Sequence, residues 1–437
     1  MKRTLLSALV MLGISPLVHA ENLLDIYQLA QTKDPTLLSA KASRDAAFEK
    51  INESRAPLLP QVNLTGTADY QKTTNDTSTR SQLGGQVALS QSLYSRSNWL
   101  NLSLSEKSAT QSDVAYNLEQ QNLILRTAQA YFAVLKAQDA LEYVQANKTA
   151  VQRQLEQTQQ RFEVGLSAIT DVNEAQAQRD QALADEISAE NTLANSYESL
   201  RELTGVDFRK LDVLNTERFS PAPTPLNADQ WMELAVDKNL SLHSARIAKD
   251  IAKEQIDLAK TGHEPTLNFN ASAGSTNSDY KLDSMSSQDG TTNQATAGLT
   301  LSIPLYSGGA TTSQVKQAQH NYVAASEDME KSYRSMQSTV RSYYNNVNAN
   351  IGSVKAYTQY VISAESSLKA TEAGYEVGTR TIVDVLDSTK ALYQAKQNLS
   401  EARYNYILNI LQLKLAAGTL QEQDLTDLNQ GLKHPAK

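Results

Sequence analysis

Cysteine is absent from this chain of 437 residues, and aromatic residues make up only 6% of it. The lack of cysteine excludes disulfides, thiolate metal sites and cysteine nucleophiles, and it is compatible with an oxidising compartment. The few aromatic residues and a mean hydropathy of -0.45 favour elongated helices with narrow apolar seams over a compact enzyme with a bulky core.

Long hydrophobic runs are missing after the first twenty residues. At the start, Lys2 and Arg3 precede an apolar stretch over residues 5–18, which ends in small residues that fit a cleavage site. This pattern predicts a cleaved signal peptide over residues 1–20, with the mature chain beginning at Glu21. The alternative is a membrane anchor, but the apolar stretch is shorter than the roughly 20 residues that span a bilayer. Any membrane span further along has to be made of strands.

Recognisable catalytic and cofactor motifs are lacking. Gly308-Gly309 stands where a strand is expected to turn into a helix, but without the pattern of a phosphate-binding loop. The histidines of the mature chain show no metal-ligand spacing; they are His243, His263, His320 and His434. The net charge of -8 argues against a nucleic-acid partner. We therefore expect no enzymatic activity, no cofactor, no metal site and no binding of nucleic acid.

Glycine and proline are scarce over long stretches of the chain. Neither occurs between Gly85 and Gly165, and no proline follows Pro304 until Pro435. Residues 98–163 can therefore form a single helix on the order of 100 Å long. Apolar residues recur in this segment in steps of seven and four: Leu118, Leu125, Phe132, Val144, Val151, Leu155 and Phe162. Such steps predict coiled-coil packing.

The chain also contains an internal repeat. RFEVGLSAITDV at residues 161–172 is matched by GYEVGTRTIVDV at residues 374–385, with Gly165 and Gly378 in equivalent places. Glycine there can end one helix and let the chain reverse. The repeat indicates duplication of a unit made of a helix, a strand hairpin, a long helix, a glycine turn and a returning helix. The predicted organisation is a signal peptide (1–20), a first repeat (21–220), a linker (221–226), a second repeat (227–420) and a C-terminal tail (421–437).

Four short segments alternate polar and apolar residues, as strands with one apolar face do. They lie at about residues 61–70, 86–93, 266–273 and 296–305, with polar loops at residues 71–82 and 277–294. Each has the length of a tilted transmembrane strand, with a face of Ser, Thr, Asn and Gln that suits a water-filled pore. The alternative is a sheet in water whose apolar face packs on helices. Because four strands cannot close into a barrel, the chain would have to oligomerise to cover its strand edges.

Four longer motifs add a resemblance to this pattern. They are DAAFEKINESRAPLLPQ from Asp45, QRFEVGLSAITDV from Gln160, SQVKQAQHNYVAASE from Ser313 and AGYEVGTRTIVDVLD from Ala373. Over residues 21 to about 425, the chain resembles the TolC family of outer-membrane channel-tunnels (the outer membrane factors), which serve bacterial efflux and type I secretion.

The resemblance implies a mainly α fold with a membrane β-barrel. In this family three protomers each give four strands to a 12-stranded barrel in the outer membrane, continued through the periplasm by a tunnel of long antiparallel coiled coils. The implied function is a passive exit duct for drugs, toxic small molecules and proteins. It is opened when a periplasmic adaptor (membrane fusion) protein and an inner-membrane transporter of the RND, ABC or MFS type dock. Two alternatives stay open: a non-conducting coiled-coil protein of the envelope, and a narrower outer-membrane channel for metal efflux.

Asp384 and Asp387 are the first candidate site residues. They stand three apart just after the Gly378 turn and so share one face of a helix. One interpretation is local, because Thr381 and Asp384 have the spacing of a capping box. The resemblance implies a second role, in which both aspartates line the periplasmic entrance of the pore. A ring of carboxylates there would prefer cations and could be plugged by multivalent ones.

The resemblance also implies a latch that keeps the entrance closed. Its residues are Tyr375 and Arg380 in the second copy, with Gln154, Thr170 and Asp171 as partners in the first. Breaking these contacts would let the second-copy coil straighten, as an iris opens. The alternative for Arg380 is an ordinary surface ion pair. The adaptor is expected to contact the exposed turns at Gly165, Leu166, Gly378 and Thr379.

Overall fold

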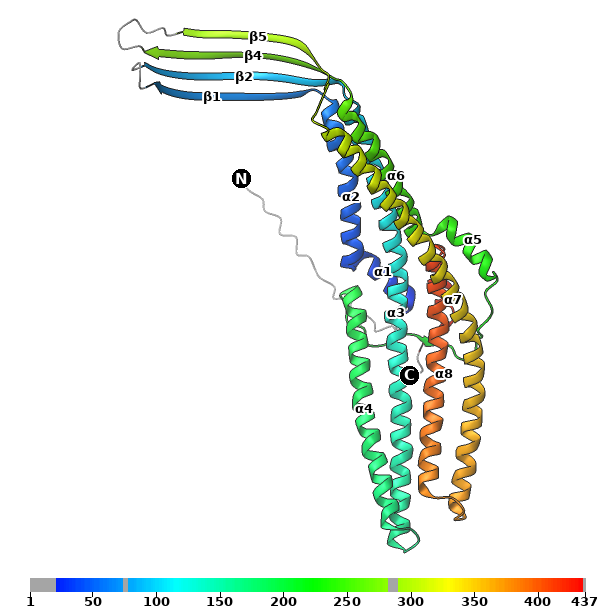
Figure 1. Ribbon diagram of the computed structural model, residues 1–437. Helices are drawn as coiled ribbons and strands as arrows, with labels where there is room; N and C mark the ends of the chain where they lie inside the picture. Colours follow the sequence, from blue (N-terminus) through cyan, green and yellow to red (C-terminus); the bar gives the residue numbers. More distant parts are fainter. Residues whose placement is uncertain (1–20, 74–77, 282–289, 435–437) are drawn as a thin grey trace, which may run out of the picture.

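The computed structural model describes residues 21–73, 78–281 and 290–434. The expected signal peptide, and the tips of the two expected strand loops, lie outside these ranges. The described chain is long and narrow, with a four-stranded sheet at one end and paired helices leading away from it (Figure 1). Among the described helices, none holds an apolar stretch long enough to cross a bilayer.

The sheet is antiparallel, with strand order β1-β2-β4-β5. Its strands are β1 (Gln61–Thr73), β2 (Ser78–Tyr94), β4 (Thr266–Lys281) and β5 (Gly290–Ser302). The prediction of loops at residues 71–82 and 277–294 is wrong for most of their length. The strand pairing continues through them, as in the pair Gln71 and Arg80. Their polar composition concealed the strands. At the other end, β5 stops at Ser302 rather than at residue 305; Pro304 follows and has no N–H to donate to a ladder.

Each copy contributes two short helices, a strand hairpin and a pair of long helices. The first copy has α1 (Leu23–Lys33), α2 (Pro35–Arg55), the short η1 (Ala56–Leu58), α3 (Arg96–Glu163) and α4 (Ile169–Thr204). The second has α5 (Ala228–Lys238), α6 (Leu240–Lys260), the short η2 (Thr261–His263), α7 (Ala310–Glu376) and α8 (Ile382–Ala416). Each repeat was expected to begin with one helix. In the structure, two helices stand in its place.

The splits occur at equivalent residues, Asp34 and Asn239. The side chain of Asp34 accepts a hydrogen bond from the N–H of Leu37, and that of Asn239 accepts one from the N–H of Leu242. A side-chain acceptor at such a corner satisfies an N–H that the new helix leaves unpaired. The corner thus starts a second helix within one periodic stretch of sequence.

The main apolar core lies where helices of both copies pack together, a region called the waist from here on. Tyr131 and Phe132 of α3 are fully buried there, and the Tyr131 hydroxyl donates to the carbonyl oxygen of Asp212 at 2.7 Å. The expected C-terminal tail is in fact folded: α9 (Glu422–Asn429) packs on this core, and β6 (Leu432–Lys433) pairs with β3 (Val213–Leu214).

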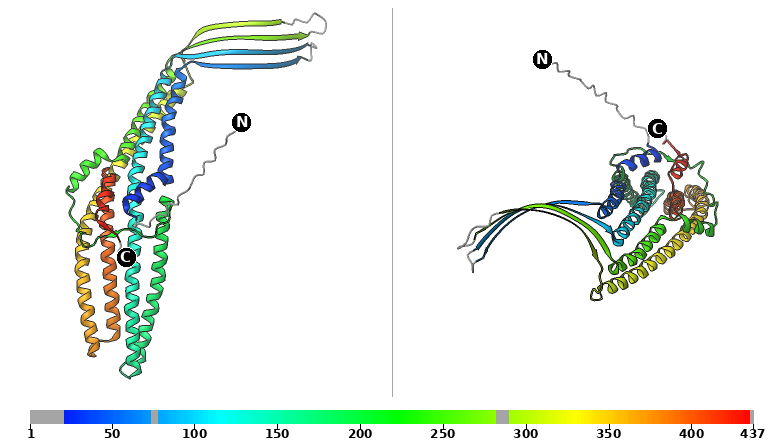
Figure 2. Two further views of the ribbon diagram at one scale, coloured as in Figure 1. Left: turned by 180° about the vertical axis from the view of Figure 1, so that it is seen from behind. Right: turned by 90° about the horizontal axis from the view of Figure 1, so that it is seen from above.

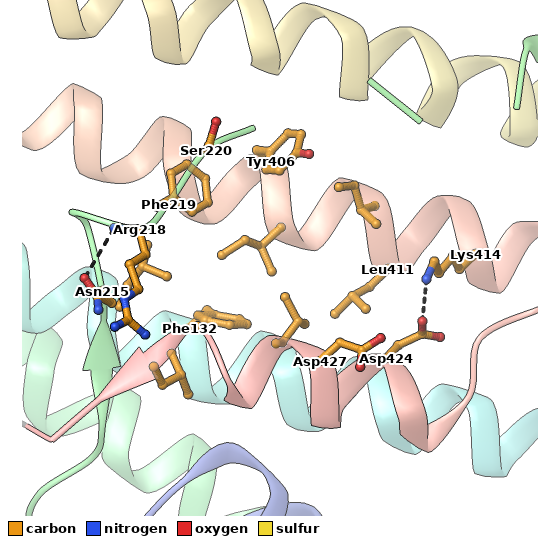
Figure 3. A pocket seen from close by; sticks show the side chains of 16 residues that line it. Phe132, Asn215, Arg218, Phe219, Ser220, Tyr406, Leu411, Lys414, Asp424 and Asp427 are labelled. Atoms are coloured by element: carbon orange, nitrogen blue, oxygen red, sulfur yellow. Dashed lines mark hydrogen bonds and ion pairs between the residues drawn. The ribbon is translucent and has the colours of Figure 1, made fainter. Parts of the chain in front are cut away.

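A pocket of about 300 Å³ remains at the waist between the chain after β3, α8 and α9 (Figure 3). Phe132, Phe219 and Leu411 lie on its apolar wall, and Lys414 pairs with Asp424 at one end. The hydroxyl of Tyr406 donates to the carbonyl oxygen of Ala222 at 2.9 Å. This bond attaches the segment between the two copies to α8.

Candidate functional site

The two faces of the sheet differ in chemistry. One face exposes large apolar side chains, with Leu64 80% and Leu299 65% accessible. Others on the sheet are Val62, Tyr70, Leu83, Val87 and Leu301. The register holds them together across strands, as in Leu64 with Val87 and Leu267 with Leu301. Apolar area of this extent is unfavourable in water and marks a contact with lipid or protein.

The opposite face is polar and hollowed. The sheet curves strongly when seen from above (Figure 2, right), and a hollow of about 510 Å³ lies on its polar side. Its lining consists of small and uncharged polar residues with one arginine: Thr65, Thr67, Arg80, Gln82, Gly84, Gln86, Ser272, Thr276, Gln294 and Thr296 are among them. Gly274 permits a close approach here, since a β-carbon on it would lie 2.8 Å from the carbonyl oxygen of Gly85.

The sheet ends in two open edges. In the part of the chain that the structure describes, β1 pairs only with β2 and β5 only with β4. The outer N–H and C=O groups of β1 and β5 therefore have no strand beside them. A sheet with one apolar and one polar face, open at both edges, is a segment suited to a larger closed barrel.

At the far end of the molecule, two glycine turns join the paired helices. Gly165 has φ 77° and Gly378 has φ 76°, the left-handed conformation that glycine adopts at little cost. The N–H of Leu166 donates to the carbonyl oxygen of Arg161 at 2.7 Å, which closes the first turn. Apolar side chains stand exposed at both turns: Leu166 is 70% and Val377 76% accessible.

Asp384 takes part in the local cap that its spacing predicted. The backbone N–H and the hydroxyl of Thr381 both donate to its carboxylate at 2.8 Å, and Asp384 N–H donates to the Thr381 hydroxyl at 3.3 Å. These bonds, the backbone one first, lower the pKa of Asp384. Asp387 lies one turn further along α8, exposed, with no hydrogen bond or ion pair in the described ranges.

Asp171 has the equivalent position in the first copy but different partners. Ala168 stands where the second copy has Thr381 and offers no hydroxyl. The hydroxyl of Ser167 donates to the Asp171 carboxylate instead, at 2.8 Å, with the Ala168 N–H at 3.3 Å. Within the described single chain, Arg380 forms no ion pair, so its expected partner Asp171 is not brought to it. Thr170 makes no side-chain hydrogen bond there either.

Tyr375 and Gln154, the other two residues of the expected latch, share one property. The Tyr375 hydroxyl and the Gln154 side-chain oxygen are both buried without a hydrogen-bond partner in the described chain. A buried polar group in this state costs free energy that a partner would recover. Around them, an apolar cluster joins the two copies: Val151, Leu155, Ala175, Ile382, Val385 and Leu386 form it, and Tyr375 packs against it.

Two residues near this cluster were missed in the sequence. The guanidinium carbon of Arg161 lies 4.6 Å from the ring centroid of Tyr375. Gly374, which occupies the place of Arg161 in the second copy, has Arg380 folded over it, so that an added β-carbon would meet Arg380 Cγ at 2.7 Å. A comparison of the two copies could have identified them, because Arg161 in the first copy is replaced by Gly374 in the second. Phe162, placed in the apolar seam by its spacing, is instead exposed.

A sheet with one apolar and one polar face, continued by long paired helices, is the architecture of an outer-membrane channel with a helical tunnel. Comparisons with known proteins identify the family. The model of the outer membrane efflux protein family matches residues 26–206 and 231–419, one range in each copy. The chain belongs to the outer membrane efflux protein family.

Curated relatives cover almost the whole chain. Outer membrane protein TolC of Vibrio cholerae is 54% identical over 423 residues, with 96% of each chain covered. The Escherichia coli protein of the same name is 49% identical, over 99% of this chain and 89% of that one. The alkaline protease secretion protein AprF of Pseudomonas aeruginosa is 30% identical, over 93% of this chain and 86% of its own length. The resemblance to TolC is thereby confirmed.

Solved channels share the fold at low identity. The Campylobacter jejuni CmeC outer membrane channel has a TM-score of 0.79 at 16% identity, covering 94% of this chain and 90% of that one. VceC of Vibrio cholerae has a TM-score of 0.75, covering 91% and 96%. The protein is accordingly an outer-membrane efflux and secretion channel with its helical tunnel in the periplasm. The alternative of a non-conducting coiled-coil protein is thereby wrong.

Proposed function

We propose that the chain works as a homotrimer and forms a passive exit duct without a catalytic step. The open edges of β1 and β5 support this, because pairing β1 of one protomer with β5 of the next would satisfy both. Three such sheets give a 12-stranded barrel with Leu64 and Leu299 towards outer-membrane lipid. The hollowed polar face then lines a water-filled bore.

The helical end is the gate in this proposal. Asp384 and Asp387 of three protomers stand around the periplasmic entrance. Thr381 holds the Asp384 carboxylate in its charged form, and crowding of like charges in the trimer acts in the opposite direction. A ring that keeps most of its charge at neutral pH attracts cations and repels anions.

Closure of the gate rests on contacts between the two copies and between protomers. Arg380 and Asp171 have no ion pair with each other in the single chain, so Arg380 is free to reach Asp171 and Thr170 of a neighbouring protomer. Such a bond is charge-assisted but modest where water reaches it. The buried Tyr375 hydroxyl and Gln154 oxygen offer two further groups whose partners the assembled entrance would supply.

Opening of the gate is assigned to partner proteins. A periplasmic adaptor contacts the turns at Gly165, Leu166, Gly378 and Thr379, where apolar side chains are exposed. An inner-membrane transporter of the RND, ABC or MFS type supplies energy. Their binding shifts the equilibrium from closed to open only through higher affinity for the open state. Small toxic molecules, drugs and proteins then leave through the same bore; a relative named for alkaline protease secretion supports protein cargo.

The observation that carries the proposal is the two-faced sheet with open edges. The test of its gate is the ion selectivity of purified trimers carrying both Asp384→Asn and Asp387→Asn in a planar bilayer. We expect a loss of cation preference and of block by multivalent cations. Asp229→Asn combined with Asp237→Asn, at two exposed positions on α5 distant from the turns, serves as the matched control. Unchanged selectivity in the double variant would remove the aspartates from the entrance.

A further inference from the structure

Arg161 and Tyr375 join the two copies beside the turns. Arg161 lies in the last turn of α3, and Tyr375 in the last turn of α7, so the contact connects the ends of the two coils. The guanidinium carbon stands 4.6 Å from the ring centroid, within the range of a cation–π interaction. In the described ranges Arg161 has no carboxylate within ion-pair distance, so its guanidinium contacts the face of the Tyr375 ring.

Both ends of this contact are anchored. On one side, the carbonyl oxygen of Arg161 accepts the hydrogen bond from Leu166 that closes the first glycine turn. On the other side, the Tyr375 ring packs against the apolar cluster formed by Leu155, Ile382 and their neighbours. Displacing the first turn therefore moves Arg161 at once and changes its distance from Tyr375.

The contact has no counterpart formed by the equivalent residues of the two copies. The place of Arg161 is taken by Gly374 in the second copy, and the place of Tyr375 by Phe162 in the first. Phe162 is exposed, and the backbone of Gly374 is covered by the stem of Arg380. No reciprocal stacking is possible between Phe162 and Gly374, so Arg161 is the one partner in this cation–π contact beside the turns.

We propose that Arg161 is a positioning residue of the gate: its guanidinium, stacked on the Tyr375 ring, holds the second-copy coil against the first, and an adaptor bound at the Gly165–Leu166 turn releases it. The inference rests on the proposed gate and deepens it. It uses the face of the Tyr375 ring, whereas the proposed latch uses the hydroxyl. One tyrosine then serves two contacts that a substitution can separate.

The first measurement is the closed-to-open equilibrium of full-length trimers in planar bilayers. Arg161→Gln removes the cation and is expected to shift this equilibrium about threefold per protomer, or roughly thirtyfold if three protomers open together. Arg161→Lys keeps a cation and should restore part of the closed state. Arg153→Gln removes an exposed charge two helical turns away and should leave the equilibrium unchanged. A trimer band that is lost on heating shows that each variant is assembled.

The second measurement separates ring from hydroxyl. In a Tyr375→Phe background the ring remains, so Arg161→Gln should still shift the equilibrium by the same factor. In a Tyr375→Leu background the ring is gone, so Arg161→Gln should have no further effect. An equal effect of Arg161→Gln in both backgrounds would overturn the inference.

Comparing Arg161→Gln with Arg380→Ser distinguishes a wrong role for Arg161 from a wrong gate. If Arg380→Ser opens the channel and Arg161→Gln does not, the latch stands and the role of Arg161 is wrong. If neither variant changes a channel that conducts, the proposed gate is wrong as a whole.

Discussion

Arg380 folds across the α-carbon of Gly374, so closely that a β-carbon on that glycine would lie 2.7 Å from Arg380 Cγ. Arg380 lies in the turn, just before Thr381, the N-cap of α8. The backbone N–H groups of Thr379 and Arg380 both donate to the Gly374 carbonyl oxygen, at 2.8 and 3.2 Å. A glycine in the last turn of a long helix thus sets the position of the arginine that the proposed latch depends on.

Gly374→Ala distinguishes the stability of α7 from the position of the Arg380 side chain. Alanine should stabilise α7 by about 1 kcal/mol where it fits, but its methyl group has to push the Arg380 side chain aside. We expect variant trimers to be open more often in planar bilayers, in the same direction as Arg380→Ser. Gly352→Ala is the matched control, because a β-carbon there meets nothing within 4 Å. If both alanine variants conduct alike, the packing of Arg380 on Gly374 has no part in the gate.

The corner between α1 and α2 depends on Asp34. Its side chain is 3% exposed and pairs with Arg126 at 2.8 Å while capping Leu37 N–H. Asp34→Ala removes the cap, at a cost of about 1 kcal/mol, and also removes one of the two carboxylates that pair with Arg126. Arg126 keeps its ion pair with Glu119 at 2.7 Å.

Asp34→Asn keeps the cap, as Asn239 does in the second copy, and loses the ion pair alone. Thermal unfolding of detergent-solubilised protein should therefore rank wild type above Asp34→Asn, and Asp34→Asn above Asp34→Ala. Equal midpoints for the two variants would mean that the cap contributes nothing.

Asp139 makes the stability depend on pH. It accepts hydrogen bonds from the hydroxyls of Ser400 and, at 2.9 Å, Tyr404. Burial raises its pKa, and these hydrogen bonds oppose the rise without cancelling it. Between the pKa of the unfolded chain, about 3.9, and the raised pKa of the folded one, the folded state holds a proton that the unfolded state has lost. The free energy of unfolding contributed by Asp139 therefore falls as pH rises through this window and is constant above it.

Asp139→Asn should abolish that contribution. The difference in unfolding midpoint between variant and wild type is expected to move in favour of the variant as pH rises from 4 towards neutrality. Thermal unfolding of the two proteins in parallel at several pH values measures it. A difference that is the same at every pH would contradict the assignment.

The lipid-facing side of the sheet can be tested with two neighbouring residues. Leu64→Arg places a cation on the apolar face, at a cost of about 2 to 4 kcal/mol in the middle of a bilayer. Thr65→Arg places the same cation on the hollowed polar face, where water reaches it. Outer-membrane fractions should contain far fewer trimers of the first variant than of the second. Equal amounts of both would mean that the two faces are wrongly assigned.

Much of the fold follows from local sequence. The stretch from Gly85 to Gly165 holds neither glycine nor proline, and α3 runs through most of it. Alternation identified all four sheet strands, but not their length, because beyond residue 70 the polar residues of the ladder look like those of a loop. The corner at Asp34 had a signal, an N-cap residue followed by proline at the first helical position, inside a pattern that otherwise looks like one helix.

The candidate site was less predictable for a physical reason. The cap of Asp384 is made by a residue three positions away, so spacing alone indicated it. The contact of Arg161 with Tyr375 joins residues far apart in the chain, and no local pattern encodes it. The proposed partners of Arg380 lie in another protomer, where neither one sequence nor one chain defines the distance.

Single-channel recording from the purified chain in a planar lipid bilayer decides whether the protein forms a trimeric, water-filled channel. Such a channel should give discrete conductance steps of one size, carried mainly by cations, from a preparation that is trimeric in detergent. A monomer that stays in aqueous solution and leaves the bilayer at its baseline conductance would contradict this expectation.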